Sequence, residues 1–332
     1  MNFDALFSHL GQHTIDGLSQ GAIYALVALG YTLVYGVLRL INFAHSEVFM
    51  VGTFAVLGAW TVMGANAEGG LGLTLVYVAV ALIAAALASG GVALAVERIA
   101  YRPLRKKNAP SLVFLITAIG VSTVLMETFG YVLDRGFSAF APGTFNGFGR
   151  PFGRVIAGMP TIIQNKPLLD FGIFSISNLQ LIVIGGAVAM MFALDLFINR
   201  TRMGRGVRAV AQDPDTAALM GVNKDRVIML IFILGGAMAG GAALLYGIKL
   251  GNTVFDVGFL VGIKAFTAAV LGGIGNLRGA LLGGLLLGVI EVYGATLTQS
   301  NWQDVWAFAV LVVVLMFRPT GLLGESLGRA RA

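Results

Sequence analysis

Long apolar segments separated by short polar stretches run through almost the whole chain. Nine of them reach or approach the about 20 residues that a helix needs to cross a bilayer. They cover residues 15–37, 46–66, 71–96, 111–132, 179–199, 227–248, 257–275, 279–298 and 303–317. The pattern predicts an all-α protein, a polytopic bundle of transmembrane helices in a single domain over residues 1–332. Only a short turn separates the seventh and eighth segments, so one of the two could be a re-entrant helix that does not cross the membrane. The predicted number of spans is therefore about 8–10.

The composition excludes several classes of protein. Apolar residues make up 57% of the chain and charged residues 11%, whereas an average soluble domain is about 25% charged. So little polar surface cannot cover a soluble globule, and so much hydrophobicity excludes a disordered chain. The chain has no cysteine, which excludes a disulfide scaffold and thiolate metal sites. The expected surroundings are therefore a lipid bilayer.

The basic residues predict how the chain is oriented. Lys and Arg number 22 against 16 Asp and Glu, and under nine alternating spans 16 of the 22 fall on one side. These residues are Arg39, Arg98, Arg102, Arg105, Lys106, Lys107, Arg200, Arg202, Arg205, Arg208, Lys224, Arg226, Arg278, Arg318, Arg329 and Arg331. The positive-inside rule then places the N-terminus outside and the C-terminus inside, with 133–178 as a long extracytoplasmic loop and 200–226 as a cytoplasmic loop. Because the bases form no stripe interleaved with stacking aromatics, nucleic acid is not an expected partner.

A few polar residues lie at the depth of the membrane or at its edge. An isolated charge costs at least about 2.5–3.5 kcal/mol in lipid, so Glu127, Lys264 and Glu291 are expected to face the protein interior or water. Lys264 and Glu291 lie on consecutive helices and are expected to pair, either as a structural ion pair or as part of a translocation path or gate. A fourth such residue, Asp195, is expected near the cytoplasmic border.

The polar run before the second span allows two interpretations. Asn42, His45 and Glu47 either cap the connection between the first two spans or line the path. His45 and Glu47 are two residues apart and do not share a helical face, so no metal site is predicted. The chain also shows no nucleophile–base pair at depth, so no catalytic residue is predicted and the chain is not expected to be an enzyme.

Small residues recur at helical spacing. Gly275, Gly279 and Gly283 are four residues apart, which places them on one helical face. Such a face serves either close packing of helices in the bundle or a sliding or gating surface.

The loop at 200–226 carries the strongest local signals. Asp213 is a good N-cap, Pro214 a good first helical residue, and Gly221 suits the left-handed position after a helix. The spacing predicts a helix break and then a short helix of roughly two turns, from Pro214 to Met220, at the membrane surface. This helix is either a knob that docks into a groove on a cytoplasmic partner or a solvated loop.

Three stretches resemble a known family. The run from Gly30 to Glu47, the loop from Arg208 to Val222 and the end from Phe317 to Gly324 resemble the permease subunits of high-affinity branched-chain amino acid ABC importers. The resemblance is closer to the H-type (LivH-like) permease than to the M-type and runs from Gly17 to Gly324. One departure is Ser46, where the family more usually has glycine.

The resemblance implies a multi-pass protein of the bacterial inner membrane that forms half of a translocation pathway. Its implied partners are a second homologous permease, two cytoplasmic ATP-binding subunits and a periplasmic binding protein that delivers Leu, Ile or Val. The chain itself would bind no cofactor, with ATP and Mg on the partner subunits, and it contains no GxxxxGK[ST] loop. The coupling residues would be Arg208, Ala211, Asp213, Ala217, Ala218, Leu219 and Gly221.

Two alternatives stay open. The first is an importer permease for urea, short amides or other amino acids, because related permeases resemble these sequences. The second is a secondary transporter or channel that acts alone, with Glu127 or Glu291 as a coupling carboxylate.

Overall fold

The structure is a computed structural model that describes Phe7, His9–Glu68, Gly70–Phe140, Ile156–Asp170, Phe174–Arg318 and Thr320–Gly324, without the side chains of residues 131–140. The basic tail after Gly324 and residues 141–155 and 171–173 of the predicted long loop lie outside the described residues. The described chain is helical apart from two short antiparallel pairs, β1 (Ala157–Gly158) with β4 (Asn252–Thr253) and β2 (Pro167–Asp170) with β3 (Ser175–Ser177).

The chain divides into two compact units that alternate along the sequence. Unit 1 comprises Met1–Arg39, Asn165–Ile228 and Ile263–Ala332, and unit 2 comprises Leu40–Gln164 and Met229–Gly262. The chain passes from one unit to the other inside two of its helices, α10 (Lys224–Leu250) and α11 (Val257–Gly272). Each unit therefore contains segments that are far apart in the sequence.

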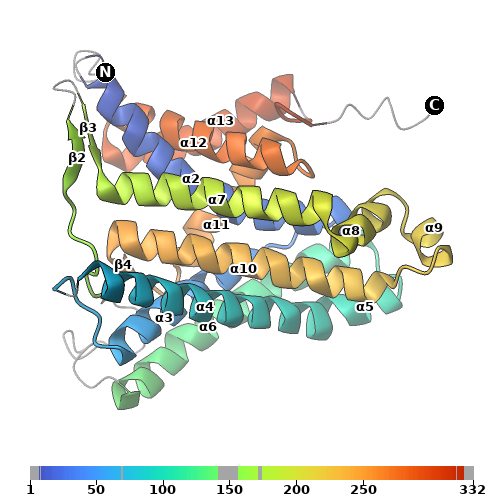
Figure 1. Cartoon of the computed structure of the whole chain (residues 1–332). Helices are drawn as coiled ribbons and strands as arrows, with labels where there is room; N and C mark the ends of the chain where they lie inside the picture. Colours follow the sequence, from blue (N-terminus) through green and yellow to red (C-terminus); the bar gives the residue numbers. More distant parts are fainter. Residues whose placement is uncertain are drawn as a thin grey trace. The chain divides into compact units, whose positions relative to one another are not determined.

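Unit 1 is built around α2 (Leu10–Leu38), the most buried of its long apolar helices. Its other elements are β2, β3, α7 (Asn178–Arg200), α8 (Arg202–Gln212), α9 (Pro214–Leu219), the start of α10, most of α11, α12 (Leu277–Leu297), η2 (Ser300–Trp302) and α13 (Gln303–Phe317). Helix α2 packs mainly against α12 and also against α7 and α8, as Figure 1 shows. The core of the unit is the apolar run Ala22–Leu29, which is completely or almost completely buried.

Glycines set the distance between α2 and α12. A Cβ atom on Gly21 would lie 2.8 Å from the Cα atom of Leu285, and a Cβ on Gly284 would lie 2.6 Å from the backbone nitrogen of Ala25. Both distances are too short for real carbon atoms, and both neighbours are backbone, which cannot swing aside. The two helices therefore meet backbone to backbone, the contact that small residues permit in membranes.

The segment after α13 closes the turn between α11 and α12. The N–H groups of Leu322 and Leu323 donate to the carbonyls of Leu271 and Gly272, at 2.8 and 3.0 Å. The side chain of Asn276 donates to the carbonyl of Leu323 at 2.9 Å. The last residues that the structure describes thus act as a strap across the turn.

The predicted glycine ladder is wrong at its first position. Gly275 lies in the turn before α12, with φ +100° and no atom within 4 Å of the position that a Cβ would take, so it does not lie on the helix face. Gly279 and Gly283 lie on α12 with their Cα atoms against the backbone of α11 at Gly272. The four-residue spacing cannot distinguish these cases, because a turn that needs a positive φ also selects glycine.

Unit 2 contains α3 (His45–Val62), α4 (Leu71–Val96), the π-helical turn η1 (Glu97–Tyr101), α5 (Arg102–Lys106), α6 (Ser111–Phe140), β1, most of α10, β4 and the start of α11. Helix α4 packs on α3 and on α10. The hydroxyl of Ser89 donates to the carbonyl of Val48 at 2.9 Å, and Gly236 and Gly240 of α10 lie against the backbone of α4.

Two predicted boundaries are wrong. The third segment does not end at residue 96, because helical structure continues through η1 and α5 to Lys106. The fourth continues to Phe140, so the first eight residues of the predicted 133–178 loop are helical. Hydropathy marks where a helix leaves the apolar layer, not where its backbone hydrogen bonding stops.

Seven helices of the described chain are long and apolar enough to cross a membrane. They are Leu10–Leu38, Leu71–Lys106, Ser111–Gly130, Asn178–Arg200, Lys224–Leu250, Leu277–Leu297 and Ser300–Phe317. The other two predicted segments correspond to α3, which begins with the polar residues His45-Ser46-Glu47, and to α11, which has only 16 residues. The fold is therefore helical with seven candidate spans.

Candidate functional site

The loop between α7 and α10 in unit 1 folds into two short helices. Helix α8 begins where the hydroxyl of Thr201 accepts from the N–H of Gly204 at 2.9 Å, and it buries Gly204, Val207 and Val210 on one face. Arg208 lies on its exposed side and donates to the carbonyl of Ile198 at the end of α7. The apolar stripe of α8 thus fixes the base of the loop on unit 1.

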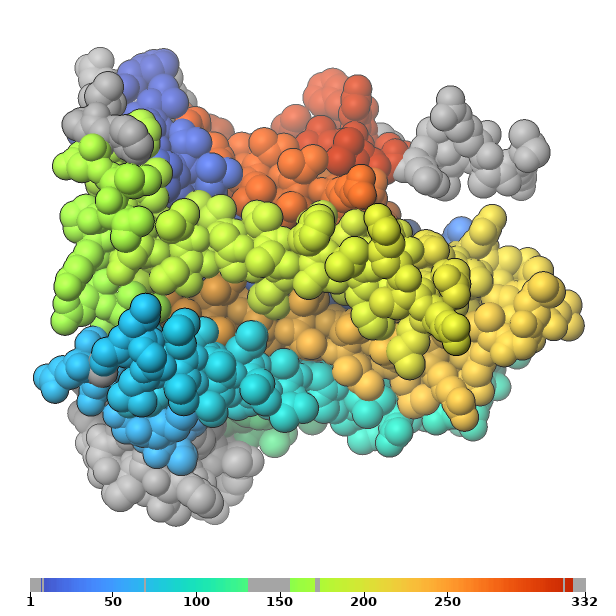
Figure 2. Space-filling view, viewed as in Figure 1, coloured from blue at the N-terminus to red at the C-terminus, as the bar shows by residue number. Residues whose placement is uncertain are grey.

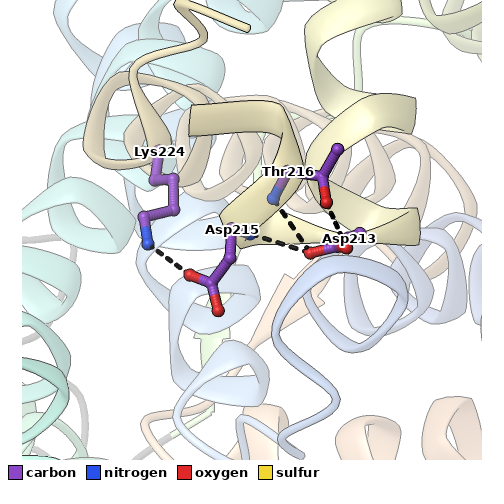
Figure 3. Close-up of polar contacts among 4 residues, drawn as sticks. All are labelled: Asp213, Asp215, Thr216 and Lys224. Carbon is purple, nitrogen blue, oxygen red and sulfur yellow. Dashed lines mark hydrogen bonds and ion pairs between the residues drawn. The ribbon is translucent and has the colours of Figure 1, made fainter. Parts of the chain in front are cut away.

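Helix α9 is held by a cap at each end, as the sequence predicts. The carboxylate of Asp213 accepts from the N–H groups of Asp215 at 2.9 Å and Thr216 at 3.1 Å, and also from the Thr216 hydroxyl (Figure 3). At the other end Gly221 has φ +87°, and its N–H donates to the carbonyl of Ala218 at 3.0 Å. Together with the bond from Val222 to Ala217, also 3.0 Å, this forms a Schellman motif.

The tip of α9 is apolar and exposed. The side chains of Leu219 and Met220 are 88% and 82% exposed, whereas Ala217 on the opposite face is buried. Ala218 is exposed, and Ala211 at the end of α8 is half-buried. In Figure 2 the yellow atoms of this loop lie on the surface of the unit. The exposed Leu–Met pair is therefore an apolar surface on a helix whose conformation is fixed by a cap at each end.

The capping carboxylate makes the order of α9 depend on pH. The hydrogen bonds from the side chain and backbone of Thr216, and then from Asp215, hold the pKa of Asp213 below its usual value. The cap therefore stabilises α9 above the unfolded pKa of aspartate, about 3.9, and is lost as the pH falls through the lower folded pKa. We expect amide-exchange protection of α9 to fall when the pH is lowered below about 4. In Asp213→Asn, which caps without titrating, protection should stay flat, and equal losses in both proteins would contradict this account.

A cluster of charged side chains in unit 1 links the helices α11, α12 and α13. The sequence predicts the pair Lys264–Glu291, and the structure confirms it as an ion pair between α11 and α12. The Lys264 ammonium also lies 2.6 Å from Asp304 in the first turn of α13 and 5.7 Å from the ring centroid of Tyr24 on α2. Glu291 is fully buried and the side chain of Lys264 is 11% exposed, whereas that of Asp304 is 48% exposed. We call Lys264, Glu291 and Asp304 the ion cluster.

The polar run at the start of α3 forms a buried group in unit 2. Glu47 is fully buried, and its Oε1 accepts from the hydroxyls of Ser46 at 3.3 Å and Ser122 at 3.2 Å. Asn42 accepts from the Tyr101 hydroxyl at 3.0 Å, and His45 is buried beside it. A Cβ on Gly258 would lie 2.6 Å from Glu47 Oε2, so glycine is needed where the first turn of α11 meets the carboxylate. The hydroxyl of Ser46 has a single proton and lies closer to the carbonyl of Phe43, at 2.7 Å, than to the Glu47 carboxylate.

The two other acidic residues predicted at membrane depth, Glu127 and Asp195, lie in different surroundings. Glu127 lies on the exposed side of α6, outside the core of unit 2. Helix α6 packs on α3 along one face only, which leaves most of its surface outside the core of unit 2. Asp195 pairs with Arg278 at 3.5 Å within unit 1.

Sequence reasoning missed several members of these groups. Asp304 is 40 residues from Lys264, and its signal was an acidic residue in the first turn of an apolar helix. A buried carboxylate in unit 2, Glu97, pairs with Arg105 at 3.0 Å across the π-helical turn, between the third and fourth predicted segments. Among the residues that the structure describes, no three His, Asp or Glu side chains are grouped to hold a metal ion.

The chain is similar to known permeases over nearly its whole length. Residues 13–315 match the family described as "Branched-chain amino acid transport system / permease component". The chain is 41% identical over 320 residues to the high-affinity branched-chain amino acid transport system permease protein BraD of Pseudomonas aeruginosa, covering 96% of each chain. It is 38% identical to LivH of Salmonella typhimurium and 37% identical to LivH of Escherichia coli, both permease proteins of the same description, covering 96% of this chain and 97% of each relative.

Proposed function

Because the chain belongs to the family of permease components of branched-chain amino acid transport systems, we propose that it carries leucine, isoleucine and valine as one half of an ATP-driven importer. It is a multi-pass membrane protein whose role is transport and not catalysis. The observation that carries the proposal is the capped α9, which presents Leu219 and Met220 to the outside of the chain. We place the protein in the bacterial inner membrane.

The proposed assembly contains two permeases, two ATP-binding subunits and a periplasmic binding protein. This chain, as a single permease domain over residues 1–332, would form half of the pathway, with ATP and Mg bound only by the partner subunits. The α8–α9 loop, including Arg208, Ala211, Asp213, Ala217, Ala218, Leu219 and Gly221, would dock into the ATP-binding subunits. ATP-driven closure of those subunits would then move the loop and switch the side to which the pathway opens.

We also propose the orientation that the bases predict, with the N-terminus outside, α8 and α9 in the cytoplasm, and the 141–178 connection outside. The polar group of Asn42, His45 and Glu47 in unit 2, the exposed Glu127, and the ion cluster in unit 1 are proposed parts of the path or its gate. Their support is that the first and last groups bury hydrogen-bonded or ion-paired side chains among apolar helices. Such groups are costly in lipid and are commonly placed there for function.

Reconstitution tests the proposal. Proteoliposomes that contain this chain, the partner permease and both ATP-binding subunits are expected to accumulate labelled leucine only with ATP and the binding protein. Isoleucine and valine should compete, whereas urea and short amides should not. Accumulation by this chain alone without ATP would overturn the proposal in favour of a secondary transporter or channel. Competition by urea alone would overturn the proposed substrate.

A further inference from the structure

The ion cluster carries an excess negative charge. It combines one ammonium, that of Lys264, with the two carboxylates of Glu291 and Asp304. A structural ion pair between buried helices needs only one carboxylate for one ammonium, because a second adds charge without a partner. Lys264 with Glu291 would already be neutral, so the placement of Asp304 beside them requires another explanation.

The cluster also has unused capacity to accept hydrogen bonds. Glu291 is fully buried, and its Oε2 has no hydrogen-bond partner among the described residues. Asp304 is about half exposed, so the ion cluster extends from the buried Glu291 to the surface of unit 1 at Asp304. A ligand that approaches from the surface therefore meets Asp304 first, and through it the Lys264 ammonium that Asp304 contacts.

The depth of the cluster fits an arriving substrate. Glu291 is 14 residues after the first residue of α12, or about 21 Å along the helix. In the proposed orientation α12 begins at the cytoplasmic side, so Glu291 lies in the outer part of the helix. Asp304 follows in the next helix after the η2 turn. The cluster would thus lie on the side from which a binding protein delivers its cargo.

We propose that Lys264, Glu291 and Asp304 form a transient binding site for the zwitterionic head group of an α-amino acid. The inference rests on the proposed function, because it gives the substrate a point of contact on this chain. The α-carboxylate of the substrate replaces Asp304 at the Lys264 ammonium, and the α-ammonium binds the released Asp304. The exchange keeps Lys264 paired throughout and gives the released Asp304 a cation of its own. Because the substrate brings one charge of each sign, the net charge of the cluster does not change. The proposed site contacts only the head group and does not bind the apolar side chain of the substrate.

Ligand-observed NMR tests the site on the assembled transporter without its binding protein. Saturation transfer is expected to L-leucine, less to 3-methylbutylamine, which has only the ammonium, and least to 4-methylpentanoate, which has only the carboxylate. The order of the two analogues follows from the negative charge of the cluster. No transfer to leucine in the wild type, or transfer to 4-methylpentanoate as strong as to 3-methylbutylamine, would overturn the site.

Variants separate this site from nonspecific binding. Asp304→Asn is expected to weaken leucine binding about tenfold, the effect of losing one charge-assisted contact. Asp195→Asn is the matched control, because it also removes a carboxylate from an ion pair of unit 1 and should leave leucine binding unchanged. Unchanged binding in Asp304→Asn overturns the proposal. If that variant does not assemble, Asp304→Glu decides, because it keeps the charge and must bind leucine within about threefold of the wild type.

The two proposals fail in different ways. If the wild-type assembly shows no ATP-driven uptake of leucine, the proposed function is wrong. If it transports leucine but Asp304→Asn binds leucine as well as the wild type does, only the binding site is wrong.

Discussion

Replacing both Leu219 and Met220 with serine is expected to abolish ATP-driven uptake while the chain still inserts into the membrane. Both side chains are more than four-fifths exposed and contribute nothing to the core of unit 1. Burial of each in a partner groove would stabilise docking by about 1.5–3 kcal/mol, so their loss should weaken docking by at least about 100-fold. Co-purification of the ATP-binding subunits with the variant measures the effect directly.

The control for this variant is an apolar residue of similar exposure in another part of the chain. Leu168 in β2 is 59% exposed, and Leu168→Ser should leave co-purification unchanged. Two further changes alter the shape of α9 and not its apolar tip. Gly221→Val cannot easily adopt φ +87°, and Asp213→Lys places a cation at a helix N-terminus, so both should uncouple ATP hydrolysis from uptake. Normal transport by all three variants would mean that α9 is not the docking element.

Replacing Gly284 and Gly288 with alanine is expected to prevent unit 1 from folding correctly. The new Cβ atoms would overlap backbone atoms of α2, at Ala25 and at Gly21. Forcing extra carbon into a packed interface costs about 1–3 kcal/mol for each position, and more where only backbone can move. Size-exclusion profiles and the thermal inactivation midpoint of the solubilised protein should both show the loss.

Gly185 provides the matched control for the two glycines. It lies on α7 in the same unit, is exposed, and has no atom within 4 Å of the position that a Cβ would take. Gly185→Ala should be neutral or slightly stabilising, because alanine favours a helix by about 1 kcal/mol over glycine. If the α12 double variant behaves like Gly185→Ala, the backbone contact between α2 and α12 is not required for folding.

Features that depend on near neighbours could be predicted from the sequence. Asp213, Pro214 and Gly221 fix α9 through contacts within a few residues, so the residue types alone indicate the caps. The family resemblance could be recognised for the same reason, because continuous runs of residues carry it. Lys264 with Glu291 was predictable because both lie in apolar helices that follow each other, where an unpaired charge is costly.

Features that depend on tertiary contacts were not predictable in this way. In the sequence Asp304 is an acidic residue at the start of an apolar segment, and only the packing of α13 brings it to Lys264. Gly275 matched a packing repeat but satisfies a turn, because both demands select glycine. Glu97 reaches Arg105 only because the helix continues as a π-helical turn through a polar stretch. The alternation of the two units also has no local signal.

The strap at residues 320–324 has a consequence for biosynthesis. A nascent chain emerges with its N-terminus first, so α2 enters the bilayer long before α12, the helix that its glycines fit, has been translated. The bonds from Leu322 and Leu323 to the end of α11 can form only after α13 has also been made. Completion of unit 1 therefore waits until residues 320–324 have been translated, and a ribosome that stalls before residue 320 leaves the turn at Gly273 without these hydrogen bonds. Quality-control proteases that recognise unfinished membrane proteins would find such a truncated chain open at this turn.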